Sequence, residues 1–164
     1  MTLSALSHQA AAVEVLTDKP IDLPGLLASS HHEQAGAVVL FSGDVRNHNI
    51  GREVSYLEYE AHNELAEKSI RKILEDAKEK WPLNIAAAQH RLGKVAILES
   101  AVVVITASAH RSEAFVANRY IIDRIKHETP IWKCEYYTNG EYSWGNNCNC
   151  AEITGDPDKH LYSQ

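Results

Sequence analysis

The sequence has only three cysteines among 164 residues, an odd number that leaves at least one thiol unpaired and is too small for a disulfide framework. It contains no apolar run of membrane-spanning length. It also lacks a G-x-G-x-x-G or Walker-type loop, so nothing predicts a nucleotide cofactor. The first eighteen residues carry no lysine or arginine, which excludes the basic region of a secretory signal and an arginine-rich transit peptide. Together with reduced thiols, these absences predict a cytoplasmic protein.

Positive charge is scarce as well. Sixteen lysines and arginines face 22 acidic residues, and the net charge is −6. This balance argues against a general nucleic-acid binder or a protein that binds anionic membranes, so any positive site must be a local concentration of cations. The length and the 45% hydrophobic content predict one globular domain. We expect this domain at 13–150, between a disordered tail at 1–12 and a loose C-terminal tail at 151–164.

The stretch from Ile105 to Glu135 organises the chain. It follows a β-branched apolar run, which is typical of a buried strand. Ser112 is the expected N-cap of a helix, and Pro130 predicts that this helix ends near His127 or Glu128. Its apolar residues recur with helical spacing, at Ala114, Ala117, Ile121 and Ile125. The residues from Ile131 to Tyr136 then alternate as a strand does.

Cations fall at chemically useful places in this stretch. His110 and Arg111 lie between a strand and a helix N-terminus, where anions are attracted. Lys126 shares a half-apolar helix face with Phe115 and Ile122, and such a lysine can have a lowered pKa and act as a nucleophile or proton donor. Lys133 follows just past the turn. The pattern alone also allows the plainer interpretation, in which both lysines and Arg111 are solvated surface charges.

The rest of the chain supplies further helices and strands. Gly43 within an apolar strand indicates a bulge or a close approach, and Asn139-Gly140 is a strong hairpin signal. We expect strands at Val13–Leu16, Gly36–Val45, Val54–Tyr59, Ile85–His90 and Glu141–Trp144, a polar loop at Arg46–Gly51, and helices at Leu23–His32 and from Asn63 to Pro82. This order predicts an α+β fold: a mixed or antiparallel sheet with helices packed on one face, hammerhead-like, plus a small C-terminal β-hairpin.

Three segments resemble the large, catalytic subunit of molybdopterin synthase. They are Phe41-Ser-Gly-Asp-Val-Arg-Asn-His-Asn49, Ala107-Ser-Ala-His-Arg-Ser112 and Pro130-Ile-Trp-Lys133. The match runs in order from about Gly36 to about Trp144. Three separate motifs at compatible spacings are more specific than any one of them.

The resemblance implies an assembly with a partner subunit, a reaction and a set of site residues. In that family the large subunit forms a homodimer, and a small ubiquitin-like subunit docks at each end to give a heterotetramer. The small subunit's C-terminal glycine thiocarboxylate delivers sulfur to cyclic pyranopterin monophosphate, which becomes the dithiolene of molybdopterin. By position, Lys126 and Lys133 match the catalytic lysines, Arg46, His110 and Arg111 the substrate- and anion-binding residues, and Phe41 a pocket wall. No metal and no cofactor is expected.

Several points stay open at this level. His48 either touches the substrate or closes its loop by hydrogen bonds. The pair His90-Arg91 follows a strand without a helix start, so we interpret it as structural or interfacial. A basic residue expected after Trp144 is missing, and Arg52 or Arg119 is a candidate replacement. Cys148, Cys150 and His160 fall short of the four ligands of a structural zinc site, so metal binding is not predicted.

Two other functions compete with sulfur transfer. The first is a non-catalytic adaptor that binds a ubiquitin-like tail, which the presence of both Lys126 and Lys133 disfavours. The second is a phosphate-ester hydrolase that uses His110 and Arg111. The sequence shows neither a carboxylate-and-histidine metal cluster nor a nucleophile–base pair for that chemistry.

Overall fold

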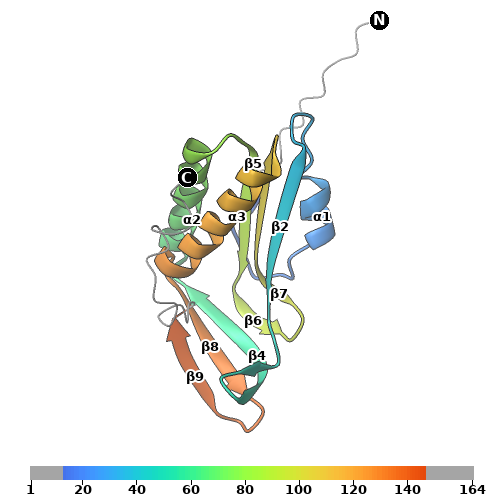
Figure 1. Cartoon of the computed structure of the whole chain (residues 1–164). Coiled ribbons are helices and arrows are strands. Elements are labelled where there is room, and N and C mark those ends of the chain that lie inside the picture. The colour runs from blue at the N-terminus through green and yellow to red at the C-terminus, as the bar shows by residue number, and fades with distance from the viewer. Residues whose placement is uncertain (1–12, 147–164) are drawn as a thin grey trace, which may run out of the picture.

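The computed structural model describes residues 13–146 (Figure 1). The expected tails at 1–12 and 151–164, as well as Cys148, Cys150 and His160, lie outside this range. The described helices are α1 (Leu23–Ala28), α2 (Asn63–Lys80) and α3 (Arg111–Glu128). The described strands are β1 (Leu16–Thr17), β2 (Ala37–Asp44), β3 (His48–Asn49), β4 (Arg52–Ala61), β5 (Leu83–Arg91), β6 (Gly93–Ala96), β7 (Ser100–Ser108), β8 (Ile131–Tyr137) and β9 (Tyr142–Asn146).

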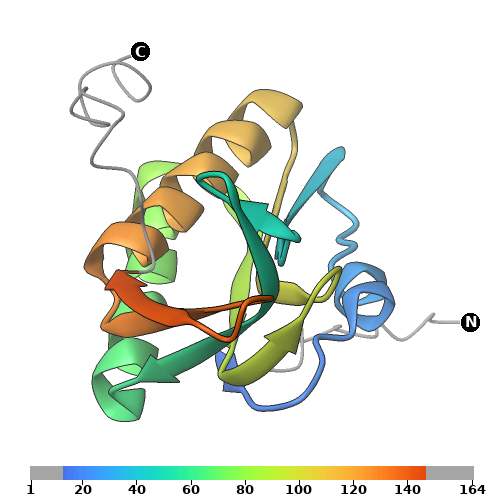
Figure 2. The ribbon, with the colours of Figure 1, turned by 90° about the horizontal axis from the view of Figure 1, so that it is seen from below.

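The predicted α+β class is confirmed, and the strands divide into two sheets. The first sheet has the order β1-β5-β7-β2, with β1 parallel to β5 and the other pairs antiparallel. The second has the order β3-β4-β8-β9, with β6 paired to β4. Helices α2 and α3 cover one face of the first sheet, and α1 lies on the other side (Figures 1 and 2). The second sheet packs below the ends of α3 and β5, and this junction positions the site.

The core explains why β7 is the central strand of the first sheet. From Ala101 to Ser108 every residue of β7 is buried, and the strand lies between β5 and β2 with α2 and α3 on one face of the sheet (Figure 1). The helix side of the core is built from small and β-branched residues, among them Ala66, Ile70, Ile73, Ala77, Val102, Val104, Ile121 and Ile125. Small residues let α2 and α3 lie close to the sheet, which fixes the end of α3 relative to the second sheet.

Prolines end both long helices as predicted, but Asn63 and Ser112, the N-caps expected for these helices, are not the caps. Helix α2 begins at Asn63 and is capped by His62, whose Nδ1 accepts a hydrogen bond from the Leu65 amide at 3.5 Å. Helix α3 begins at Arg111, with His110 as an N-cap that makes no side-chain hydrogen bond. Ser112 is therefore already inside the first turn. The expected α1 start at Leu23 is confirmed, with Asp22 as its N-cap, although the helix ends at Ala28 rather than near His32.

The predicted polar loop at Arg46–Gly51 is instead a tight hairpin. Strand β3 pairs with the start of β4 in the register His48↔Glu53 and Asn49↔Arg52. The two residues between them, Ile50 and Gly51, have φ angles of 47° and 72°. Positive φ at both central positions defines the primed turn that suits a two-residue hairpin, and it normally favours Asn-Gly. Isoleucine at the first position hid this hairpin from the sequence pattern.

Replacing Ile50 with asparagine should stabilise the protein. Ile50 is β-branched and 83% exposed, so its side chain contributes little packing while its backbone holds a left-handed conformation. That conformation costs an ordinary residue roughly 1–2 kcal/mol, and asparagine tolerates it better. We expect Ile50→Asn to raise the free energy of unfolding by about 1 kcal/mol, measured by guanidinium denaturation. Ile50→Val, equally β-branched, is the control and should bring no gain; a loss of stability in Ile50→Asn would contradict this account of the turn.

Two further turn predictions are confirmed. The strand β2 has a register shift between Gly43 and Asp44 where it pairs with β7, which is the bulge expected at Gly43. Strands β8 and β9 form the hairpin expected at Asn139-Gly140, where Gly140 has a φ of 86°. This second hairpin closes the far side of the second sheet.

Candidate active site

A cavity of about 210 Å³ opens where the end of α3, the middle of β4 and β8, and the β3–β4 hairpin meet. The lining is mostly polar and includes three cations. Its residues are Asp44, Arg46, His48, Asn49, Val54, Leu57, Tyr59, Lys126, Lys133 and Glu135. The structure thus brings four of the sequence-predicted site residues, Lys126, Lys133, Arg46 and His48, to one place.

Lys126 lies in the last turn of α3 with its amine in the cavity. The turn at Thr129-Pro130 brings Lys133, the third residue of β8, to the same space. Burial, together with the positive charge of Lys133, lowers the pKa of Lys126 from 10.5 to about 8. An ammonium group of this kind is a much stronger acid than a solvated lysine, so it can give up and take back a proton near neutral pH.

A chain of hydrogen bonds joins Lys133 to Arg46. Lys133 Nζ lies 2.8 Å from Glu135 Oε1, and both side chains are largely buried, at 15% and 8% exposed. Asn49 Nδ2 donates to both oxygens of Glu135, at 2.8 and 3.0 Å, and Tyr137 Oη donates at 3.0 Å. At the mouth, Arg46 Nη2 donates to Asn49 Oδ1 at 3.2 Å. Glu135 is therefore the centre of the network.

The ionisation of Glu135 follows from these contacts. Burial raises the pKa of the Glu135 carboxyl, but hydrogen bonds from Lys133 and Asn49 and the charge of Lys133 outweigh it, so the pKa lies below its ordinary value. The carboxylate stays charged at neutral pH and forms an ion pair with Lys133. Lys133 is thus held by Glu135, whereas Lys126 is the lysine whose pKa lies near neutral pH.

The floor of the cavity is aromatic and buried. Tyr59 pairs in register with Lys133, and its ring meets that of His90 edge-on at 5.0 Å. His90 is fully buried, and its Nδ1 lies 2.9 Å from the Arg91 carbonyl oxygen. Burial, with the nearby charge of Lys126, lowers the pKa of His90 to about 3, so the ring is neutral. Arg91 is paired with Glu99 at 2.7 Å, and the structural interpretation of His90-Arg91 agrees with this burial.

His110, Arg111 and Phe41 do not join this cavity within one chain. His110 and Arg111 are exposed at the start of α3, while Lys126 is in its last turn. Fifteen residues of helix separate Arg111 from Lys126, which is roughly 22 Å along the axis. Phe41 is 37% exposed on β2, an edge strand of the first sheet, and it does not line the cavity. In the described chain these three residues therefore lie outside the cavity that Lys126 and Lys133 line.

Glu135, Asn49 and Tyr59 are among the lining residues that the sequence analysis missed. Glu135 had a readable signal, because it follows Lys133 by two positions and so lies on the same face of a strand. Asn49 stood in the recognised polar segment without a role. Tyr59 could not be found from the sequence, because only the register of β4 against β8 brings it opposite Lys133.

The proposed replacements for the missing basic residue are engaged elsewhere. Arg52 pairs with Glu141 and lies over the Tyr137 ring, 3.5 Å from its centroid. Arg119 pairs with Asp123 at 2.6 Å. Neither lines the cavity. Among residues 13–146, no group of three histidine, cysteine or acidic side chains is placed to hold a metal ion.

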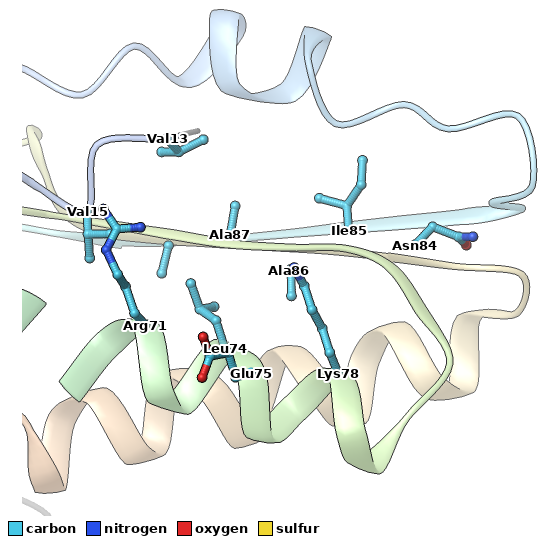
Figure 3. Close-up of a pocket in the computed structure, with 11 residues that line it drawn as sticks. Val13, Val15, Arg71, Leu74, Glu75, Lys78, Asn84, Ile85, Ala86 and Ala87 are labelled. Carbon is cyan, nitrogen blue, oxygen red and sulfur yellow. The ribbon is translucent and has the colours of Figure 1, made fainter. Parts of the chain in front are cut away.

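A second cavity, of about 290 Å³, lies between α2 and β5 of the first sheet (Figure 3). Arg71, Leu74, Glu75 and Lys78 reach into it from α2, against the alanine-rich floor of β5. None of the sequence-predicted site residues lines it. Its charged side chains come from the solvated face of α2, so the chemistry concentrates in the smaller cavity.

A lysine of lowered pKa beside a second, carboxylate-held lysine and an arginine is typical of an enzyme that acts on an anionic substrate.

Comparison with known proteins gives the family. Residues 16–128 match the family model described as MoaE protein. The molybdopterin synthase catalytic subunit of Thermoplasma volcanium is 45% identical over 129 residues, which cover 79% of this chain and 94% of that one. That of Staphylococcus aureus strain COL is 41% identical over 127 residues, covering 77% and 85% of the two chains.

Comparison with solved structures supports the same family. The crystal structure of molybdopterin synthase from Staphylococcus aureus superposes with a TM-score of 0.75 at 38% identity, covering 80% of this chain and 95% of that one. The chain belongs to the MoaE family of molybdopterin synthase catalytic subunits. It is accordingly an enzyme of molybdenum cofactor biosynthesis. In the described range, 13–146, none of the helices has the length and apolarity needed to span a membrane.

Proposed function

We propose that this chain transfers sulfur from the C-terminal thiocarboxylate of a small ubiquitin-like subunit to cyclic pyranopterin monophosphate, forming the dithiolene of molybdopterin. The observation that carries the proposal is that Lys126 and Lys133 line one partly dry cavity, with Arg46 at its mouth. The sulfur donor is an anionic chain terminus and the acceptor carries a cyclic phosphate. Fixed cations in a desolvated site bind both more strongly than water-exposed cations would.

Lys126 is the proton donor of the transfer step. When the thiocarboxylate sulfur bonds to a substrate carbon, an oxygen leaves that carbon and needs a proton. Water then hydrolyses the bond between this sulfur and the acyl carbon of the tail, which leaves the sulfur on the substrate and releases the tail as a carboxylate. An ammonium group with a pKa of about 8 can supply this proton and regain it from solvent at neutral pH. Before the proton moves, its positive charge also stabilises the negative charge that develops on the oxygen.

Lys133 and Arg46 hold the two anionic partners. Glu135 lies 2.8 Å from Lys133 Nζ and holds this amine in place, so that Lys133 binds the carboxyl end of the incoming tail. Arg46 presents a planar fork toward the phosphate at the mouth of the cavity. His48 is exposed beside it, and its Nδ1 lies 2.9 Å from Asn47 Oδ1, which orients the ring for contact with the same substrate.

A second copy of the chain completes the site. Arg111 and His110 lie at the opposite end of α3 from Lys126 and close to the start of β2, where Ala37 pairs with Ser108. Strand β2 is an outer strand of the first sheet and carries Phe41, which is 37% exposed, so both are available to a partner. In a homodimer, His110, Arg111 and Phe41 of one protomer extend the cavity of the other. The small subunit then binds at each end, in the cytoplasm, to give a heterotetramer.

Reconstitution tests this function directly. The purified chain is incubated with the thiocarboxylated small subunit and cyclic pyranopterin monophosphate, and the products are separated by chromatography. Formation of the dithiolene product supports sulfur transfer. Release of phosphate would instead support a hydrolase, and tight binding of the small subunit without product would support an adaptor; either result would overturn the proposal.

A further inference from the structure

Asn49 links the two cationic groups of the cavity. Its Oδ1 accepts a hydrogen bond from Arg46 Nη2 at 3.2 Å, and its Nδ2 donates to Glu135 Oε1 and Oε2 at 2.8 and 3.0 Å. Glu135 in turn binds Lys133 at 2.8 Å. One amide thus connects the residue at the mouth with the carboxylate that holds the lysine inside.

The chemistry of this position requires an amide. Arginine can only donate and a charged carboxylate can only accept, so the residue between them must accept on one side and donate on the other. The two neighbours also fix which end of the Asn49 amide is oxygen, because the reverse orientation would oppose donor to donor and acceptor to acceptor. An aspartate has the same shape but would place a second carboxylate about 3 Å from Glu135, where like charges repel.

The backbone holds Asn49 in place. It is paired with Arg52 across the β3–β4 hairpin, and Ile50 and Gly51 close the turn directly after it. A two-residue turn leaves little freedom for the preceding residue, so the amide meets Glu135 in one orientation. Arg46 lies three positions earlier, on the exposed side. Among residues 13–146, Asn49 is the only hydrogen-bond partner described for its side chain.

We propose that Asn49 is a positioning residue that orients Arg46 toward the substrate phosphate and, through Glu135, fixes Lys133 for the incoming thiocarboxylate. This inference rests on the proposed function. Loss of the hydrogen bond between Asn49 and Arg46 weakens phosphate binding and raises KM. Loss of the hydrogen bonds between Asn49 and Glu135 disturbs Lys133 and lowers kcat. The reacting atoms are touched by Arg46 and Lys133, not by Asn49 itself.

Steady-state kinetics of the reconstituted complex separate these two effects. We expect Asn49→Ala to raise KM for cyclic pyranopterin monophosphate and to lower kcat, each by about tenfold, as is usual for the loss of a hydrogen bond to a charged group. Asn49→Asp should lower kcat at least as much. A residue that merely shaped the hairpin would tolerate aspartate, which is isosteric and suits turns. Asn139→Ala, in the β8–β9 turn away from the cavity, is the matched control and should keep both constants.

Double-mutant cycles show whether Asn49 acts through its neighbours. In an Arg46→Ala background, Asn49→Ala should raise KM by less than about twofold, and in a Glu135→Gln background it should lower kcat by less than about twofold. Fully additive effects in both cycles would overturn the inference, as would wild-type kinetics of Asn49→Asp. Melting temperatures identify any variant that fails to fold; if Asn49→Ala does, the cycles are run with Asn49→Asp.

The same data distinguish a failure of this inference from a failure of the proposed function. If Arg46→Ala and Lys126→Ala impair turnover while the Asn49 variants do not, only the role of Asn49 is overturned. If Arg46→Ala and Lys126→Ala themselves leave turnover unchanged, the site assignment fails first, and the role of Asn49 fails with it.

Discussion

Replacing Lys126 with methionine is expected to abolish dithiolene formation and to stabilise the folded protein at pH 7. The loss of the proton donor should slow turnover by about a thousandfold, within the range of general acid catalysis. Methionine nearly matches the volume of the lysine stem, so the cavity keeps its shape and the small subunit still binds. Product formation and binding of the small subunit are measured on the same preparation.

The gain in stability follows from the sign of the pKa shift. The pKa of Lys126 falls from 10.5 to about 8 on folding, so the unfolded state binds the proton more tightly. The charged lysine therefore costs the folded state about 3 kcal/mol below pH 8, at 1.36 kcal/mol per pKa unit, and this cost disappears as the pH rises toward 10.5. Guanidinium denaturation at pH 7 should show a higher midpoint for Lys126→Met. Lys68→Met, at an exposed position of α2, is the control and should change neither quantity.

Normal turnover of Lys126→Met would contradict the role of this lysine. A lower unfolding midpoint would contradict its desolvation. The two readouts are independent, because one depends on the reaction and the other only on the buried charge.

Two inactive variants should restore activity when they share one dimer. If Arg111 of one protomer serves the cavity that holds Lys126 of the other, a heterodimer of Lys126→Met and Arg111→Ala has one site with both changes and one intact site. Heterodimers selected with two different affinity tags should then show about half of the wild-type turnover, although each homodimer is nearly inactive. Dithiolene formation is the measurement.

The matched control pairs Lys126→Met with Lys133→Met. Both lysines line the cavity of the same chain, so every site of that heterodimer lacks one of them and no activity should return. Absence of recovery in the Lys126→Met and Arg111→Ala pair would show that one protomer supplies the whole site, contrary to the proposal.

Much of this fold could be predicted because its signals are local. The β-branched run before Ile105 gave the central strand, apolar spacing gave α2 and α3, and prolines 82 and 130 marked their ends. Asn139-Gly140 gave the β8–β9 hairpin. The β3–β4 hairpin escaped because Ile50 occupies a turn position that asparagine normally marks.

The site was predictable only where its residues are close in sequence or matched by a family motif. Lys126 and Lys133 flank a single turn, so their meeting could be expected. The contact of Asn49 with Glu135 joins positions 86 residues apart and depends on the register of β4 against β8. The separation of Arg111 from Lys126 depends on the straight length of α3, which the motif spacing does not express.

The pKa of Lys126 itself tests the central claim most directly. Protein labelled with ¹³C at the lysine ε-carbon is titrated by NMR, and the Lys126 signal is identified by its absence in Lys126→Met. A desolvated amine beside Lys133 predicts a pKa near 8, and Lys133→Met should raise it. A pKa near 10.5 for Lys126 in the wild-type complex would contradict the claim that this cavity holds a lysine prepared for proton transfer.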